Sequence, residues 1–332
     1  MKHAKLLSVA AFVGLAGATF AQYTSPELML VTDLGGTTPL GSTAPPQIER
    51  YDPYTGAYLG AFGAGYVTDP TGITISGSDA YVSDPIVVGS TDYTRIDKFN
   101  FSTGAYDGSI MDYAPFRIWG LGTYGSNLLA TDAGDGTGSN CGVYTITLAG
   151  TQTGFQGLPT DAYGESVAAD GSRMYVATAG GLGFYSYNLN SSGISTGLNF
   201  NAGVGSWYWG AAAFAAKGSA YAGGENSSGY GVVDEFSTTG ALLSEYTNAS
   251  QAFDSLAFGH NGMMYAFDEN GDQILRFDAT TPLNFGPIGS FTLNDTGHGA
   301  RLAVYAAPEP VSMFALGAGV LGLALRRRKR AG

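Results

Sequence analysis

Residues 47–52 read Gln47-Ile48-Glu49-Arg50-Tyr51-Asp52, and a strand of this kind recurs five more times along the chain. The other copies lie at 95–100, 142–147, 183–188, 231–236 and 273–278. Each copy is soon followed by a turn, at Gly56, Gly104, Gly150, Gly193, Gly240 and Pro282. These turns recur at roughly 42–48 residues, a period that suits a propeller blade of four strands. The internal repeat therefore predicts an all-β propeller.

Two further strands precede each copy and predict the inner pair of each blade. Five such pairs are complete, at 72–75 and 80–84, 120–123 and 128–132, 166–169 and 174–178, 211–214 and 220–223, and 255–258 and 264–268. The sixth pair is divided between the two ends of the chain. Residues 28–33 resemble a second inner strand without its first, and residues 301–305 resemble a first inner strand without its second. Pairing these two segments closes the ring and removes the exposed strand edges at the seam. The sequence thus predicts one six-bladed β-propeller at 22–306, closed by its own ends.

Composition agrees with a packed all-β body. The chain has 332 residues, of which 44% are hydrophobic, and it contains 51 glycines, 21 tyrosines and 18 phenylalanines. A chain this apolar can bury a core, which argues against low-complexity disorder. Cys141 is the single cysteine, so an intramolecular disulfide is excluded and stability must come from packing.

Several repeats resemble the NHL repeat of known propellers. The clearest runs from Asp69-Pro70-Thr71-Gly72-Ile73 through Arg95-Ile96-Asp97-Lys98-Phe99 to Gly104. The resemblance covers the body unevenly, and it implies a propeller rather than a particular activity.

The N-terminus has the organisation of a signal peptide. Lys2, His3 and Lys5 form a basic start, 6–18 is apolar, and Thr19-Phe20-Ala21 places small residues at the positions that a signal peptidase reads. We therefore expect 1–21 to be removed by signal peptidase and the exported chain to begin near Gln22.

The C-terminal segment 307–332 has three parts in a fixed order. Pro308-Glu309-Pro310 is followed by an apolar run at 311–325 and by the basic tail Arg326-Arg327-Arg328-Lys329-Arg330. The apolar run predicts a short membrane helix of about 22 Å, which is marginal for the hydrocarbon core. Clustered cations disfavour translocation, so we expect the C-terminus to be cytoplasmic and the body to lie outside the inner membrane.

This tripartite tail resembles the PEP-CTERM sorting signal of Gram-negative bacteria, over residues 308–330. The resemblance implies recognition by an exosortase, cleavage near Pro308-Glu309-Pro310, and delivery to the cell surface or its polysaccharide. An ordinary C-terminal membrane anchor is the alternative interpretation.

Charge excludes one class of partner. Outside the two terminal segments, eight basic residues face 26 acidic residues. A surface this acidic repels the phosphates of nucleic acids and attracts cations. We therefore expect no nucleic-acid binding.

Propeller topology places the loops between second and third strands on the same side as the loops that lead into the next blade. That face is predicted to carry the loops 84–94, 132–141, 223–230 and 268–272, and all three tryptophans. The aromatic candidates for ligand contact are Trp119, Trp207, Tyr208 and Trp209, because aromatic faces stack on sugar rings. The alternative is that alternate residues of 207–209 fill the gap between blades.

Four aspartates end the second inner strand of four blades: Asp33, Asp84, Asp132 and Asp268. Carboxylates collected near the axis could hold Ca²⁺, which takes six to eight oxygen ligands. The alternative is a structural role, in which each aspartate accepts backbone N–H bonds.

Catalytic signals are weak. Outside the signal peptide only His260 and His298 remain, and neither has a recognisable nucleophile beside it.

We expect a binding module in the exopolysaccharide or envelope, with an envelope protein or polysaccharide as partner. Two alternatives stay open. The first is a hydrolase or lyase that uses Asp/Glu pairs on extracellular carbohydrate or lactones. The second is a structural surface protein without a specific ligand.

Overall fold

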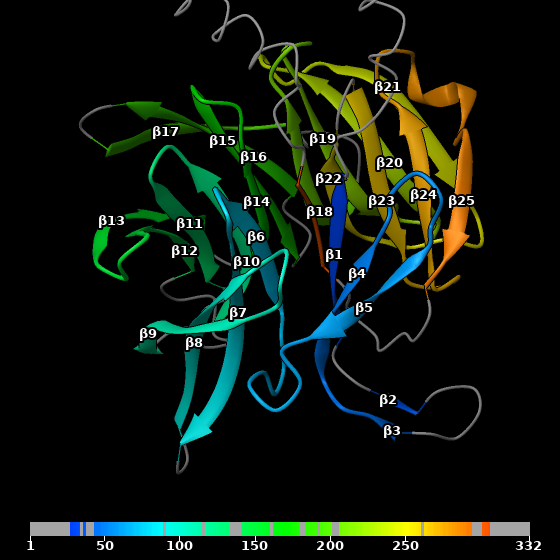
Figure 1. Cartoon of the computed structure of the whole chain (residues 1–332). Coiled ribbons are helices and arrows are strands. Elements are labelled where there is room, and N and C mark those ends of the chain that lie inside the picture. Colours follow the sequence, from blue (N-terminus) through cyan, green and yellow to red (C-terminus); the bar gives the residue numbers. More distant parts are fainter. Residues whose placement is uncertain are drawn as a thin grey trace, which may run out of the picture. The chain divides into compact units, whose positions relative to one another are not determined.

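Six four-stranded antiparallel sheets make up the body of the protein in the computed structural model (Figure 1). The structure describes residues 27–33, 36–37, 43–88, 91–114, 117–132, 141–159, 162–179, 183–190, 193–200, 206–259, 262–293 and 301–305. Residues Leu28–Tyr305 form one compact unit. The predicted signal peptide at 1–21 and the predicted sorting segment at 307–332 lie outside the described residues. No helix within the described ranges has the length and apolar character to cross a membrane.

The first three sheets, numbered as blades in chain order, are written from the innermost strand outward. Blade 1 consists of β26 (Leu302–Tyr305), β1 (Leu28–Asp33), β4 (Gln47–Tyr51) and β5 (Tyr58–Phe62). Blade 2 consists of β6 (Gly72–Ser76), β7 (Asp79–Val88), β8 (Thr91–Asn100) and β9 (Tyr106–Ala114). Blade 3 consists of β10 (Ile118–Tyr124), β11 (Asn127–Asp132), β12 (Gly142–Thr147) and β13 (Gln152–Gly157).

The remaining three sheets follow the same order. Blade 4 consists of β14 (Tyr163–Ala169), β15 (Arg173–Ala179), β16 (Gly183–Asn190) and β17 (Gly193–Asn199). Blade 5 consists of β18 (Trp207–Phe214), β19 (Ser219–Glu225), β20 (Gly231–Ser237) and β21 (Leu242–Asn248). Blade 6 consists of β22 (Phe253–Phe258), β23 (Met263–Asp268), β24 (Gln273–Asp278) and β25 (Gly289–Thr292). A short hairpin, β2 (Gly36–Thr37) with β3 (Thr43–Ala44), and the 3-10 turn η2 (Leu283–Phe285) complete the described elements.

The two ends of the repeat close the ring in the predicted way. Strand β26 pairs with β1 in antiparallel register, with Leu28 opposite Tyr305 and Val31 opposite Leu302. The innermost strands then contact one another in a complete cycle, in the order β26, β6, β10, β14, β18, β22 and back to β26. The six-bladed fold and its terminal closure are therefore confirmed.

The hairpin between β7 and β8 is longer than the sequence pattern predicted. Residues 84–94 were expected to form a loop, but β7 continues to Val88 and β8 begins at Thr91. Pairing continues through Pro85 opposite Thr94 and Ile86 opposite Tyr93. The β-branched and aromatic residues of this segment favour extended backbone, which accounts for the extra ladder.

Glycines allow neighbouring innermost strands to approach closely at the axis. A Cβ added to Gly120 of β10 would lie 2.5 Å from the carbonyl oxygen of Glu165 and 2.7 Å from the Cα of Ser166 on β14. These contacts are to backbone, which cannot move aside as the end of a side chain can. The small residues of the innermost strands are therefore required by the convergence of the sheets.

Aromatic side chains fill the wedges between blades. Between blades 4 and 5, for example, Phe184, Phe200, Tyr208 and Phe236 form one buried cluster with ring centroids 5.7–6.3 Å apart. Offset and edge-to-face contacts at such distances are the favoured aromatic geometries. This packing explains the tyrosine and phenylalanine content and supplies stability without a disulfide.

Replacing Gly120 by Ala is expected to lower the free energy of unfolding by about 1–3 kcal/mol, because the added methyl overpacks the axis. The matched control is Gly154→Ala on the outer strand β13, where the nearest atom to an added Cβ is 3.5 Å away. Urea unfolding of the two variants measures the difference. Equal stabilities would contradict the close axial packing.

Candidate functional site

Four innermost strands carry a β-bulge near their beginning, always at the same position. In β10, β14, β18 and β22 the ladder skips one residue, and the skipped residues are Trp119, Glu165, Trp209 and Asp254. A bulge adds an unpaired residue to one strand and redirects its side chain. Four successive blades therefore present one extra side chain each at the same end of the axis.

These side chains line a cavity at the mouth of the axis, which we call the axial mouth. Its volume is about 240 Å³, and its lining consists of Thr71, Trp119, Glu165, Trp209, Asp254, Glu269 and Arg301. In ring order, Glu165 of blade 4 lies between Trp119 of blade 3 and Trp209 of blade 5. An acidic side chain is thus flanked by two indoles.

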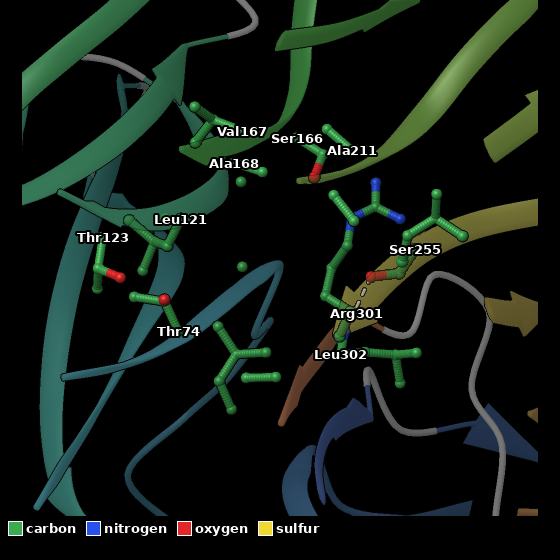
Figure 2. Close-up of a pocket in the computed structure, with 18 of the residues that line it drawn as sticks. Thr74, Leu121, Thr123, Ser166, Val167, Ala168, Ala211, Ser255, Arg301 and Leu302 are labelled. Atoms are coloured by element: carbon green, nitrogen blue, oxygen red, sulfur yellow. Dashed lines mark hydrogen bonds between the residues drawn. The ribbon is translucent and has the colours of Figure 1, made fainter. Parts of the chain in front are cut away.

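Arg301 occupies a position at which other blades have a small residue. Its backbone N–H donates to Thr32 Oγ1 at 2.9 Å, just as the N–H of Gly120 donates to Thr131 Oγ1 at 2.8 Å. The corresponding residues of blades 4 and 6 are Ser166 and Ser255, each directly after the bulge. Figure 2 shows the Arg301 side chain extending into the axial space among the strands that carry Ser166, Ala211 and Ser255.

The guanidinium of Arg301 contacts two acidic residues, one of them on the opposite blade. Its Nη1 donates to the backbone oxygen of Asp254 at 2.8 Å and lies 3.7 Å from Asp254 Oδ2. Its Nη2 lies 3.4 Å from Oε2 of Glu165, three blades away in the ring of six. Both carboxylate distances exceed the 2.7–2.9 Å that is usual for strong charge-assisted hydrogen bonds.

Arg301 also lines a second cavity, which has a volume of about 260 Å³. The innermost strands line this cavity, with residues that include Thr74, Leu121, Thr123 and Val167 (Figure 2). Arg301 lines both cavities and is only 6% exposed. Its Nε and the Nε1 of Trp119 are buried and have no hydrogen-bond partner among the described residues.

Burial is the largest influence on the pKa of Glu165. Loss of solvent raises the pKa of this carboxyl above its usual value, Arg301 lowers it, and the nearby charge of Asp254 raises it further. The net direction is upward, so Arg301 does not fully compensate the buried negative charge. The axial mouth therefore combines two indole rings, the carboxyls of Glu165, Asp254 and Glu269, and two buried N–H donors.

The structure divides the predicted aromatic candidates into three environments. Trp119 and Trp209 both line the axial mouth, and the Arg117 guanidinium lies 5.6 Å from the ring centroid of Trp119. Trp207 is 46% exposed at the start of β18 and is not part of the cavity lining. Tyr208 is fully buried and donates its hydroxyl to Asp234 Oδ2. A fully buried ring offers no face to a ligand, so Tyr208 is a core residue.

The four predicted metal ligands are not brought together. All four aspartates are buried, in four different blades: Asp33, Asp132 and Asp268 end β1, β11 and β23, whereas Asp84 lies within β7. No group of three or more His, Cys, Asp or Glu side chains in the described part of the chain is arranged to hold a metal ion.

Three of these aspartates accept hydrogen bonds from the segment that leads into their own blade. Asp84 Oδ1 accepts the N–H groups of Thr68 and Asp69 at 2.9 and 2.7 Å, and its Oδ2 pairs with Arg95 at 2.7 Å. Asp132 Oδ1 accepts the N–H of Arg117 at 3.2 Å. Asp268 Oδ1 accepts the N–H of Ala252 at 3.1 Å. This is the structural role that the sequence left open as the alternative to Ca²⁺ binding.

The charged residues of the axial mouth were not identified from the sequence pattern. Glu165, Asp254 and Arg301 each lie just before or at the start of a predicted innermost strand, outside the apolar pattern that identified it. Aligning the small residues Gly120, Ser166, Gly210 and Ser255 would have placed Glu165 and Asp254 in one column with Trp119 and Trp209. His260 and His298 lie outside the described residues.

Comparisons with known proteins identify the tail and the fold. Residues 306–329 match the model of the PEP-CTERM protein-sorting motif. The chain therefore carries this motif, which marks an exported protein that is held at the membrane before an exosortase processes it. No curated protein matches the chain.

Among solved structures, a chain of a nidogen/laminin complex matches with a TM-score of 0.58 at 13% identity. The match covers 84% of this chain and 100% of that one. At this level of identity the likeness concerns the fold alone, and it agrees with the propeller.

The buried pair of Tyr208 and Asp234 predicts a pH dependence of stability. Burial, followed by the charge of Glu245, raises the pKa of Asp234 from 3.8 to about 7, although the Tyr208 hydroxyl opposes the shift. The folded state then binds this proton more tightly than the unfolded state, so stability falls as pH rises from about 4 to 7.

Asp234→Asn is expected to remove this contribution, because its amide does not titrate. Chemical unfolding at pH 5 and pH 8 measures it as the difference between the wild type and the variant. The wild type is expected to lose more stability over this interval. Parallel pH profiles would show that Asp234 does not titrate in this range.

Proposed function

We propose that this exported propeller binds carbohydrate of the extracellular matrix or cell envelope, and that the axial mouth is the contact site. After signal peptidase has removed 1–21, the body lies outside the inner membrane with the basic tail in the cytoplasm. Exosortase processing near Pro308-Glu309-Pro310 then delivers it to the surface. The sorting motif supports export, and the chemistry of the axial mouth supports the ligand class.

The observation that carries this proposal is the mixed lining of the axial mouth. A sugar ring has an apolar face for stacking, and each hydroxyl is both a donor and an acceptor. Trp119 and Trp209 offer indole faces, while Glu165 and Asp254 offer acceptors. Trp119 Nε1 and Arg301 Nε are buried donors that gain an acceptor if a hydroxyl enters beside them. A purely apolar ligand would leave these polar groups desolvated at a cost.

Trp207 extends the proposed surface beyond the axial mouth. It starts the strand that carries Trp209 two residues later, and it is substantially exposed. An exposed indole supplies rigid contact area at low entropic cost. We assign Trp207 to the contact with further units of a longer saccharide.

A second candidate function is hydrolysis of a glycosidic bond in the same cavity. The observation that favours it is the pair of carboxyls, Glu165 and Asp254, in one cavity, with the pKa of Glu165 raised by burial. Glycosidases use such a pair, in which the carboxyl of raised pKa is the general acid. Reducing-end release by the wild type, lost in Glu165→Gln while binding is retained, identifies an enzyme. Binding without release leaves the binding module.

Trp119→Ala and Trp209→Ala are each expected to weaken binding of matrix oligosaccharide at least about tenfold, because each removes a stacking face. Trp207→Ala is expected to weaken binding of long chains and to leave short ones unchanged. Titration calorimetry of the full chain with oligosaccharides of increasing length measures both effects.

The matched control is Phe285→Ala, which removes an aromatic ring that is 76% exposed on η2, outside the axial mouth. Its affinity should equal that of the wild type. Full affinity in both Trp119→Ala and Trp209→Ala would contradict the axial site. Failure of any matrix saccharide to bind would favour a structural protein without a specific ligand.

A further inference from the structure

Two buried hydrogen-bond donors of the axial mouth have no acceptor. They are the indole Nε1 of Trp119 and the guanidinium Nε of Arg301, and neither has a hydrogen-bond partner among the described residues. Both residues line the same cavity, and Arg301 is almost completely buried. A buried N–H group without an acceptor carries its desolvation penalty uncompensated. The two donors therefore favour a ligand that brings an acceptor into this cavity.

The other donor groups around these two are already engaged. Arg301 Nη1 donates to the backbone oxygen of Asp254 at 2.8 Å, and Nη2 lies 3.4 Å from Oε2 of Glu165. These contacts hold the side chain where Figure 2 shows it, extended into the axial space. The hydroxyl of Thr71, which also lines the axial mouth, donates to the backbone oxygen of Ile118 at 2.8 Å. Nε is thus the nitrogen of Arg301 that remains for a ligand.

An unpartnered Nε is not in itself a site. Arg50 on β4 and Arg276 on β24 also have a buried Nε without a partner among the described residues. Neither belongs to the described lining of the axial mouth. The axial mouth differs because two such donors line one cavity, together with the indole rings of Trp119 and Trp209.

A neutral carbonyl fits these donors better than a charged group does. An amide oxygen has two lone pairs and no proton, so it can accept from two N–H groups and adds no donor of its own. An ammonium group has three donors and no acceptor, and would leave Trp119 Nε1 and Arg301 Nε unpaired. A carboxylate could accept from both, but it would share the cavity with Glu165, whose pKa is already raised by burial. A second negative charge there would add repulsion.

The remaining parts of an acetamido group also match the lining. Its N–H is a donor, and the carboxyl of Glu165 is an acceptor in the same cavity. Its methyl group is apolar and suits the face of an indole. Trp119 and Trp209 come from the blades on either side of Glu165. One substituent of a sugar ring would therefore use the donors, the acceptor and the aromatic surface together.

We propose that the axial mouth selects N-acetylated sugars, with the acetamido carbonyl as the acceptor for Trp119 Nε1 and Arg301 Nε. This selection rests on the proposed saccharide binding and adds a ligand class to it. The amide N–H donates to Glu165, the methyl group packs against an indole, and the sugar ring occupies the rest of the axial mouth.

The experiment compares four probes on the full-length protein by titration calorimetry. They are the β-1,4-linked tetramers of N-acetylglucosamine, glucosamine and glucose, and a galacturonic acid tetramer. The glucose tetramer keeps the ring and the linkage and has a hydroxyl in place of the acetamido group. The acetylated probe is expected to bind at least about tenfold more tightly than the glucose probe, because it pairs buried donors. The amine and the uronate are both expected to bind more weakly than the acetylated probe.

Two variants remove the donors one at a time. Trp119→Phe keeps an aromatic ring and loses Nε1–H, and Arg301→Lys keeps the positive charge and loses the guanidinium Nε. Each is expected to lower the ratio of the acetylated to the glucose affinity several-fold. The ratio is the readout, because stacking contributes to both probes. Trp119→Phe still decides the question if Arg301→Lys does not fold.

Arg50→Lys is the matched control, because it removes an unpartnered Nε that lies outside the axial mouth. It should leave the ratio of affinities unchanged. A ratio that falls equally in this control would overturn the selection, since the effect would then not come from the axial donors. An unchanged ratio in Trp119→Phe would overturn it as well.

The probes separate the two proposals. Equal affinities for the acetylated and glucose tetramers, with binding still dependent on Trp209, would overturn the selection and keep the saccharide site. Tightest binding of the uronate or of the free amine would also overturn it, because the axial mouth would then recognise charge. If none of the probes binds, the saccharide site and its selection fail together.

Discussion

The pairing of β26 with β1 is the interaction on which the rest of the structure depends. It joins the two ends of the repeat into one sheet, with Val31 opposite Leu302, and so completes the cycle of contacts between innermost strands. Convergence of those strands then requires small residues such as Gly120. The same pairing delivers Arg301 to the axis, because the residue directly before β26 is fixed by its bond to Thr32.

Ring closure therefore also creates the axial mouth. Arg301 of the closing segment contacts Asp254 of the preceding blade and Glu165 of the opposite one. These contacts cost desolvation of three charged groups, and their long distances return only part of it. The proposed function uses the carboxyls of Glu165 and Asp254 as acceptors for a ligand that approaches from the mouth.

The fold could be predicted from the sequence because it repeats a local pattern. Alternation and turn residues defined the strands, and the divided sixth pair at 28–33 and 301–305 predicted the closure. The site was harder to predict, because a bulge changes which face a residue occupies without changing its residue type. The sequence analysis therefore grouped Trp209 with Tyr208 and Trp207. In the structure Trp209 lines the cavity, Tyr208 lies in the core and Trp207 is exposed on the surface. The recurrence of Asp84 and Asp268 at equivalent positions was clear from the sequence. Only the structure shows that their carboxylates accept hydrogen bonds from backbone N–H groups.

The central claim is that a saccharide binds between Trp119 and Trp209 in the axial mouth. A crystal structure of the protein with an oligosaccharide from the producing cell's own matrix tests it most directly. We predict a sugar ring against at least one of these indoles, with hydroxyl contacts to Glu165 and Asp254. A saccharide bound on the outer strands, with the axial mouth empty, would contradict it.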